Sequence, residues 1–210
     1  MREIRLICFD RPDETRQCVQ HLLRCHYFSS WYRIASIDGQ PDGSHNAGVV
    51  EALKDFPGEV ILRPRLGMNE HIRTNFAESN SEYYFHLEDD ILLAKDALLW
   101  AEFSARKFNS QYGAYCCMGN DEGIDKLDEY TSYHRFCAYG TLICAFAMRR
   151  ILNSWRGEWS YWDCGISDLW REWNWTTCMP QVTRARNIGY PPGSPLGQAM
   201  YRSRWSDDFT

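Results

Sequence analysis

The amino-acid sequence predicts an α/β fold around a mainly parallel central sheet. Short apolar runs alternate with amphipathic, helix-like segments through the first half of the chain, a pattern typical of β–α crossover units. Three of the apolar runs end at an aspartate, namely Asp10, Asp38 and Asp90. A length of 210 residues with 44% hydrophobic residues suits one domain with a sizeable core, so we expect a single domain over residues 1–210.

Four strand–helix units are expected in the first half. Each expected strand is an apolar run with β-branched or aromatic residues, and the helices carry apolar residues three or four positions apart, as Val19, Leu22 and Leu23 do. The strands are predicted at residues 4–10, 32–39, 59–64 and 82–90, and the helices at residues 14–25, 47–56, 69–79 and 94–108. Because right-handed crossovers bring the carboxyl ends of parallel strands together, we expect the three aspartates along the sheet edge that binds ligands.

The second half of the chain is less regular. The predicted elements are a strand at 112–119, an exposed acidic loop at 121–135, a strand turning into a helix near Ala145 within 136–155, a loop and short helix at 161–173, and an extended segment at 176–189. Residues 191–210 are rich in proline, glycine and serine, which predicts an irregular tail. Six of the nine tryptophans lie between residues 155 and 175, where core packing is favoured over a stacking platform for a sugar or base.

The composition limits the class of protein. A net charge of −5 argues against a broad, sequence-independent grip on nucleic acid. Nine cysteines, an odd number without regular spacing, fit reduced thiols. The opening MREIRLICFD holds no apolar stretch of signal-peptide length, and no run approaches the roughly 20 apolar residues of a membrane span. We therefore expect a cytoplasmic protein, bacterial or virus-encoded, with no membrane partner.

Glu88, Asp89 and Asp90 form three consecutive acids at the end of the fourth expected strand. Buried strands avoid adjacent carboxylates because unpaired charges are costly to desolvate. Two interpretations remain open: a solvated turn before the next helix, or a carboxylate that binds Mn²⁺ or Mg²⁺ together with phosphate oxygens. The position at a strand end in this alternation favours the cation, which would neutralise charge on a departing diphosphate.

No glycine-rich phosphate-binding motif is present. The sequence has neither G-x-G-x-x-G after its first strand nor G-x-x-x-x-G-K-[ST], which argues against a dinucleotide-binding dehydrogenase or a P-loop enzyme. A diphosphate would then need a metal or basic side chains, and the candidates for the latter are Arg63, Arg65 and Arg73.

Four short motifs follow one another within residues 4–190. They are Asp10-Arg11 after the first strand, Asp38 after the second, Glu88-Asp89-Asp90 after the fourth, and later Trp162-Asp163. In kind, order and rough spacing they resemble the motifs of the type A nucleotide-sugar glycosyltransferases, and most of all the N-acetylglucosaminyltransferase I group with its protein O-mannose-linked relatives. The resemblance implies a nucleotide-binding, Rossmann-like type A fold, with a donor half at residues 1–93 and an acceptor and catalytic half at 94–190.

The resemblance also implies a role for each matching donor-side residue. Arg11 and Asp38 would contact the nucleoside, Asp38 through the uracil of a UDP-sugar. Asp89 would hydrogen-bond the ribose, Glu88 would approach the donor sugar, and Asp90 would ligate Mn²⁺ or Mg²⁺. On charge grounds Arg73 joins them as a donor-binding residue.

The resemblance makes Asp163 the general base that deprotonates the acceptor hydroxyl in an inverting displacement. A competing interpretation is that Asp163 caps the helix that follows it. The family continues its tryptophan-aspartate pair with a second acid, whereas Cys164 stands here, so Asp168 remains a rival base.

The predicted function is metal-dependent, hexosyl- or N-acetylglucosaminyl-type transfer from a nucleotide-sugar to a hydroxyl. The acceptor is left open between a glycan, a protein side chain and a hydroxylated base of phage DNA. One alternative is a nucleotidyltransferase on the same sheet, although residues 8–18 lack the glycine that its phosphate loop would be expected to carry. The other is a non-catalytic carbohydrate-binding module that uses the tryptophans alone.

Overall fold

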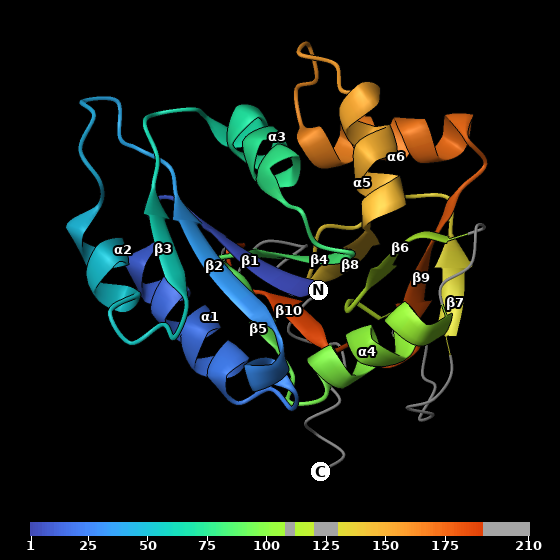
Figure 1. Cartoon of the computed structure of the whole chain (residues 1–210), viewed down its shortest axis with the longest axis horizontal. Helices are drawn as coiled ribbons and strands as arrows, with labels where there is room; N and C mark the ends of the chain where they lie inside the picture. The colour runs from blue at the N-terminus through green and yellow to red at the C-terminus, as the bar shows by residue number, and fades with distance from the viewer. Residues whose placement is uncertain (108–111, 120–129, 191–210) are drawn as a thin grey trace.

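An eight-stranded sheet lies between two layers of helices in the computed structural model, which describes residues 1–107, 112–119 and 130–190 (Figure 1). From one edge to the other the strands are β3 (Glu59–Leu62), β2 (Tyr32–Ile37), β1 (Arg2–Cys8), β4 (Tyr83–Glu88), β8 (Thr141–Cys144), β6 (Tyr112–Cys116), β9 (Thr176–Pro180) and β7 (Tyr130–Tyr133). Among these described strands only β8 and β7 run against the other six. The predicted α/β fold with a mainly parallel sheet is confirmed.

The helices divide between the two faces of the sheet (Figure 1). On one face lie α1 (Pro12–Leu23), α2 (Ala47–Ala52) and α4 (Ala97–Lys107), and on the other α3 (Met68–Glu78), α5 (Ala145–Asn153) and α6 (Trp162–Glu172). A short 3-10 helix, Phe28–Ser30, precedes β2. Each face has its own buried hydrophobic cluster, with Leu6 and Leu22 in the first and Ile143 and Trp170 in the second. No helix in the described part of the chain is long and apolar enough to span a membrane.

Local sequence signals start the first two helices close to the ends of their strands. α1 begins at Pro12, whose fixed φ suits the first helical position, and Asp13 and Glu14 in its first turn favour the positive end of the helix dipole. The Asn46 side chain caps α2 by accepting hydrogen bonds from two backbone amides at 2.9 and 3.2 Å. The connections from β1 and β2 therefore stay at the carboxyl edge of the sheet.

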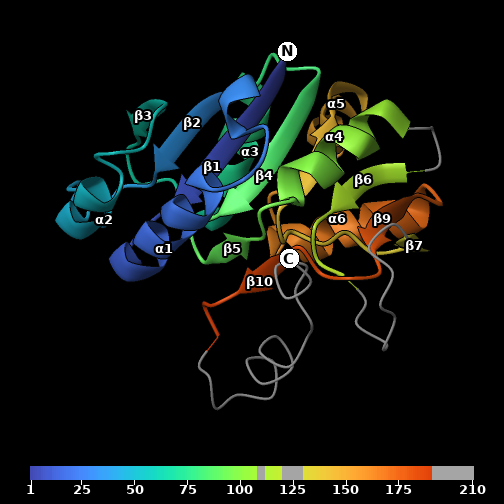
Figure 2. The ribbon, with the colours of Figure 1, turned by 90° about the horizontal axis from the view of Figure 1, so that it is seen from below.

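The acidic triplet does not continue the fourth strand as predicted. β4 ends at Glu88, and Asp89 and Asp90 form a turn before an unpredicted strand, β5 (Ile91–Leu93). This strand pairs antiparallel with β10 (Ala185–Asn187) in a separate small sheet, and Figure 2 shows the two side by side. The following helix consequently begins at Ala97, three residues later than predicted. Asp89 and Asp90 thus lie outside the main sheet, although both stay buried, at 6% and 5% exposed.

Two predictions for the second half are corrected. The expected loop at 121–135 contains β7, which pairs antiparallel with β9 at the edge of the sheet. This edge strand is mostly exposed, so it carries no alternation of apolar and polar residues that would have revealed it. The expected extended segment at 176–189 is two strands, β9 and β10, which belong to different sheets. The predictions for residues 120–129 and for the tail 191–210 lie outside the described residues.

The tryptophan-rich region forms core. Trp162, Trp170 and Trp175 are at most 8% exposed, and three more tryptophans, Trp155, Trp159 and Trp173, pack against the same cluster. A Cβ atom at position 165 would lie 2.0 Å from the Trp159 ring, so Gly165 is what allows α6 to approach that ring. The preference for core packing over a stacking platform is confirmed.

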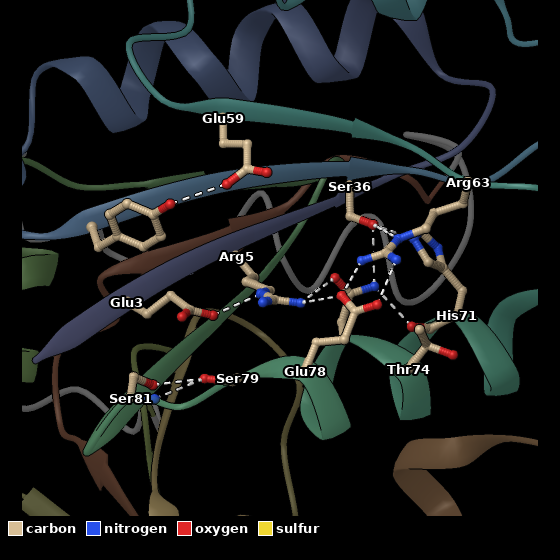
Figure 3. Close-up of polar contacts among 12 residues, drawn as sticks. Glu3, Arg5, Ser36, Glu59, Arg63, His71, Thr74, Glu78, Ser79 and Ser81 are labelled. Carbon is tan, nitrogen blue, oxygen red and sulfur yellow. Dashed lines mark hydrogen bonds and ion pairs between the residues drawn. The ribbon is translucent and has the colours of Figure 1, made fainter.

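A buried polar network fixes α3 to the sheet (Figure 3). Arg5 donates from Nε to Glu3 Oε1 at 2.6 Å and from Nη1 to Asn75 Oδ1 at 3.0 Å, and Glu78 lies 3.3 Å from the same Nη1. Arg5, Glu3 and Asn75 are at most 3% exposed. Because a buried charge is tolerated only when it is paired and hydrogen-bonded, this network holds α3 in one position relative to β1.

The network reaches the carboxyl edge of the sheet through Ser36. Its hydroxyl lies 2.8 Å from Nε2 of His71 and accepts hydrogen bonds from Asn75 Nδ2 and Arg63 Nε, each at 3.2 Å (Figure 3). Arg63 also pairs with Glu78. Arg63, one of the three arginines that were candidates for binding phosphate, is therefore part of the structural polar network.

We expect His71→Gln to reduce the loss of stability on acidification. Burial, as the largest cause, lowers the pKa of His71 from 6.5 to about 4, so the unfolded chain binds its proton more readily than the folded one. Stability contributed by the neutral imidazole is present above pH 6.5 and is lost as the pH falls towards 4. The gap corresponds to about 3 kcal/mol of unfolding free energy. Urea unfolding at pH 7, 5.5 and 4.5 measures the unfolding free energy of the wild type and of the variant. His26→Gln, at an exposed histidine, is the control. Equal pH dependence of stability in both variants would contradict the expectation.

Candidate active site

A cavity of about 200 Å³ opens at the carboxyl ends of β1, β2 and β4. The parallel registers pair Cys8 with Ile37 and Ile7 with Glu88, so the three strands end at nearly the same level. Four predicted donor-binding residues line the cavity: Arg11, Asp38, Glu88 and Asp89. The expected meeting of these strand ends at one edge is therefore confirmed.

Asp38 is an anchor for the wall of this cavity. Its Oδ1 accepts a hydrogen bond from the Leu66 amide at 2.7 Å, and its Oδ2 accepts from the Gly67 amide at 2.9 Å and from Arg65 Nη1 at 3.1 Å. Gly67 has a φ of +79°, a backbone conformation that suits glycine and lets the chain turn into α3. Asp38 thus holds the loop between β3 and α3 against the end of β2.

The arginine candidates separate clearly in the structure. Arg65 lines the cavity, with its guanidinium 4.4 Å from the centroid of the Phe9 ring, which lines it too. Arg73 is not among the lining residues; it pairs with Glu70, one helical turn away on α3, at 2.6 and 2.7 Å. The cavity wall therefore offers Arg11 and Arg65 as cations, together with an aromatic face that sequence reasoning missed.

The three acids occupy different environments. Glu88 lines the cavity with its side chain 20% exposed. Asp89 accepts a hydrogen bond from the Phe9 amide at 3.1 Å, and burial, as the largest cause, raises its pKa to about 7. Asp90 Oδ2 is ion-paired with Arg11, while burial and then the charge of Glu88 raise the pKa of Asp90 to about 6. The site thus concentrates negative charge in a place that favours a cation.

Asp90 has the free donor atom that a metal would need. Its Oδ1 is buried and finds no hydrogen-bond partner among the residues that the structure describes. The chain passes close by at Gly189, where a Cβ atom would lie 2.1 Å from Asp90 Oδ2. No group of three histidine, cysteine, aspartate or glutamate side chains could hold an ion within the described ranges. A hard cation that takes one carboxylate and several phosphate or water oxygens fits such a site.

The structure separates the two candidate bases. Asp163 lies in the first turn of α6, accepts a hydrogen bond from the Cys164 amide at 2.8 Å, and lines a second cavity of about 320 Å³. Asp168 is on the exposed face of α6 and pairs with Arg171 at 3.0 Å. Only Asp163 of the two borders a space that could hold an acceptor.

His86 connects the two parts of the site and was missed by sequence reasoning. The side chain is fully buried, and neither ring nitrogen has a hydrogen-bond partner within the described residues. Its Nε2 lies 3.6 Å from Glu88 Oε1, and its ring meets that of Trp162, the neighbour of Asp163, at a centroid distance of 4.8 Å. The available signal was its place two residues before Glu88, on the same face of β4.

Comparison with solved structures agrees with this architecture. The chain superimposes on the mannosyltransferase PcManGT from Pyrobaculum calidifontis, in complex with GDP-Man and Mn²⁺, with a TM-score of 0.59 and 13% identity over 90% of this chain and 59% of that one. The fold is of the type A glycosyltransferase kind. S. aureus TarS, residues 1–349, matches with a TM-score of 0.57 and 8% identity over 84% of this chain and 57% of that one. This chain of type A fold thus spans less than two thirds of the length of both structures. No protein-family model and no curated protein sequence matches the chain.

Proposed function

We propose that this protein is a metal-dependent glycosyltransferase that moves a sugar from a nucleotide-sugar to an acceptor hydroxyl with inversion. The observation that carries the proposal is the cavity at the ends of β1, β2 and β4, with Arg11, Glu88 and Asp89 in its wall; Asp90 does not line the cavity but is ion-paired with Arg11. In open α/β sheets this edge is where nucleotides bind. The type A fold, the one seen with GDP-Man and Mn²⁺ in PcManGT, supports the same function.

The donor half of the proposed site is residues 1–93. Arg65 and the Phe9 ring supply a cation and an aromatic face for a nucleoside, and Asp89 supplies a carboxylate for the ribose. Glu88 faces the cavity and is the residue proposed for the donor sugar. The resemblance of the sequence motifs to the N-acetylglucosaminyltransferase I group favours a UDP-sugar, and the solved mannosyltransferase makes a GDP-sugar the alternative.

Asp90 is the residue proposed to hold Mn²⁺ or Mg²⁺. Bound there, the metal would neutralise the charge that develops on the departing diphosphate. Arg11 pairs with Asp90 through its Nη1, so the same guanidinium is available as a second positive group for the phosphates.

Asp163 is the proposed general base in the acceptor half, residues 94–190. Its carboxylate takes the proton of the acceptor hydroxyl while the hydroxyl oxygen bonds to the anomeric carbon and the nucleoside diphosphate leaves. Its place in the wall of the second cavity, and the surface position of Asp168, support this assignment.

Nucleotide binding with and without metal tests the proposed function. We expect UDP or GDP to bind in an isothermal titration, with an affinity at least about tenfold higher in Mn²⁺ than in EDTA, because the cation offsets repulsion between diphosphate and carboxylates. Slow hydrolysis of one sugar nucleotide to free sugar and nucleoside diphosphate should accompany binding. Failure of both nucleotides to bind in Mn²⁺ would reject the function, and release of pyrophosphate from UTP or GTP in the presence of a sugar 1-phosphate would favour a nucleotidyltransferase.

A further inference from the structure

The second cavity is connected to the donor cavity through His86. Asp163 lines the second cavity and follows Trp162, whose ring meets that of His86 at a centroid distance of 4.8 Å. His86 Nε2 lies 3.6 Å from Oε1 of Glu88, which lines the donor cavity. Tyr139 also lines the second cavity, and its hydroxyl lies 3.1 Å from that of Tyr190. An acceptor in the second cavity would therefore lie near the residue proposed for the donor sugar.

The lining of the second cavity is mainly apolar and aromatic. Met118 follows β6, Met179 belongs to β9, and both contribute thioether side chains. The aromatic members are Tyr133, Phe136 and Tyr139. Arg135 and Asp163 are the only charged side chains among the described residues of this lining. Aromatic rings and thioethers are the groups that pack best on the face of another aromatic ring.

From this lining we infer that the acceptor presents its hydroxyl on, or one carbon away from, a planar aromatic ring. The inference rests on the proposed function, since it names the acceptor class for the same site. A glycan would bring several hydroxyls into the cavity, and each buried hydroxyl without a partner weakens binding. The volume of about 320 Å³ is at the lower end of small-ligand pockets and suits one ring system better than an oligosaccharide.

Each charged residue in the lining then has a function in acceptor binding or reaction. Asp163 takes the hydroxyl proton as the new bond to the anomeric carbon forms and the bond to the diphosphate breaks, so the products are the aryl or arylmethyl glycoside and the nucleoside diphosphate. Arg135 is an exposed cation in the same lining and suits an anionic group carried by the ring, such as a phosphate.

Equilibrium binding without donor tests the acceptor class. Ligand-detected NMR and isothermal titration, run with saturating UDP or GDP and Mn²⁺ to fill the donor cavity, would compare benzyl alcohol, 5-hydroxymethyl-2′-deoxycytidine 5′-monophosphate and lactose. We expect both aromatic alcohols to bind more tightly than lactose. Tyr133→Ala should weaken both by about fivefold or more, because it removes a stacking face. Tyr130→Ala is the matched control, since Tyr130 is on the same strand, is 50% exposed and does not line the cavity.

The outcomes distinguish a nucleotide base from other aromatic rings, and they distinguish failure of the acceptor class from failure of the proposed function. Arg135→Gln should weaken only the phosphate-bearing ligand, and tighter binding of that ligand than of benzyl alcohol identifies a nucleotide base as the ring. Tighter binding of lactose, or equal effects of Tyr133→Ala and Tyr130→Ala, would overturn the inference. Titration of UDP and GDP with Mn²⁺ into the Tyr133→Ala variant should give wild-type affinity. If the wild type binds neither UDP nor GDP, the proposed function is rejected. If it binds a nucleotide but binds lactose more tightly than the aromatic alcohols, only the acceptor class is rejected.

Discussion

Asp90→Asn is expected to lower sugar transfer by about a thousandfold, because the metal is held by this carboxylate in the proposed site. Without a metal to stabilise the leaving diphosphate, the transition state loses several kcal/mol of stabilisation. Each 1.36 kcal/mol added to the barrier lowers the rate about tenfold. The measurement is the rate of product formation as Mn²⁺ is titrated. The wild type should respond steeply to the metal, and the variant should respond hardly at all.

The fold should tolerate this substitution. The raised pKa of Asp90 means that its ionised form is disfavoured by burial, so a neutral amide of the same size removes an electrostatic cost. Arg11, which loses its partner, has a side chain 43% exposed and can be solvated instead. A variant with a normal melting temperature and weakened binding of Mn²⁺ in the presence of nucleotide would assign the loss to the metal site.

Asp96→Asn is the matched control. Asp96 also pairs with an arginine, Arg184, at 2.9 Å, and its side chain is 28% exposed, but it does not line either of the two cavities described above. Its substitution removes one aspartate–arginine pair without touching the proposed metal ligand. Equal activities of the Asp90 and Asp96 variants, or full metal dependence in the Asp90 variant, would refute the metal assignment.

The residues that sequence reasoning placed at the carboxyl edge, and that the structure brings together there, are those fixed by strand topology. Asp38 and Glu88 follow apolar runs in an alternating α/β pattern, and right-handed crossovers leave few places for the ends of those runs other than one sheet edge. Asp163 was proposed from its likeness to a family motif rather than from topology. The sequence alone does not distinguish Asp163 from Asp168. The orientation of α6 about its axis distinguishes them, because it places the Asp163 carboxylate at a cavity and the Asp168 carboxylate in solvent.

Two of the missed features, β7 and His86, depend on contacts between segments distant in the sequence, whereas Arg73 depends on a neighbour on its own helix. Arg73 was predicted at the donor site, but the direction of its side chain depends on how α3 is rotated, and Glu70 on the same helix pairs with it. The edge strand β7 depends on its partner β9, more than 40 residues later, and lacks a pattern of its own. The burial of His86 involves Trp162 on α6, whose ring meets the imidazole at a centroid distance of 4.8 Å. Charge and periodicity along the chain do not reveal the pairing of β7 with β9 or the packing of Trp162 over His86.

Asp163→Asn is expected to lower transfer to the acceptor by about a hundredfold to ten-thousandfold, the usual contribution of a general base. The amide keeps the size of the side chain and can still accept the hydrogen bond from the Cys164 backbone, but it cannot take a proton from the acceptor hydroxyl. Nucleotide and metal binding should remain at wild-type affinity, since the donor cavity does not include this residue. Asp168→Asn, on the exposed face of the same helix, is the matched control and should leave the rate within about twofold, because a surface ion pair contributes little. The reverse result, with the Asp168 variant inactive and the Asp163 variant active, would move the base to Asp168; full activity in both would exclude the two candidates and require a different proton acceptor.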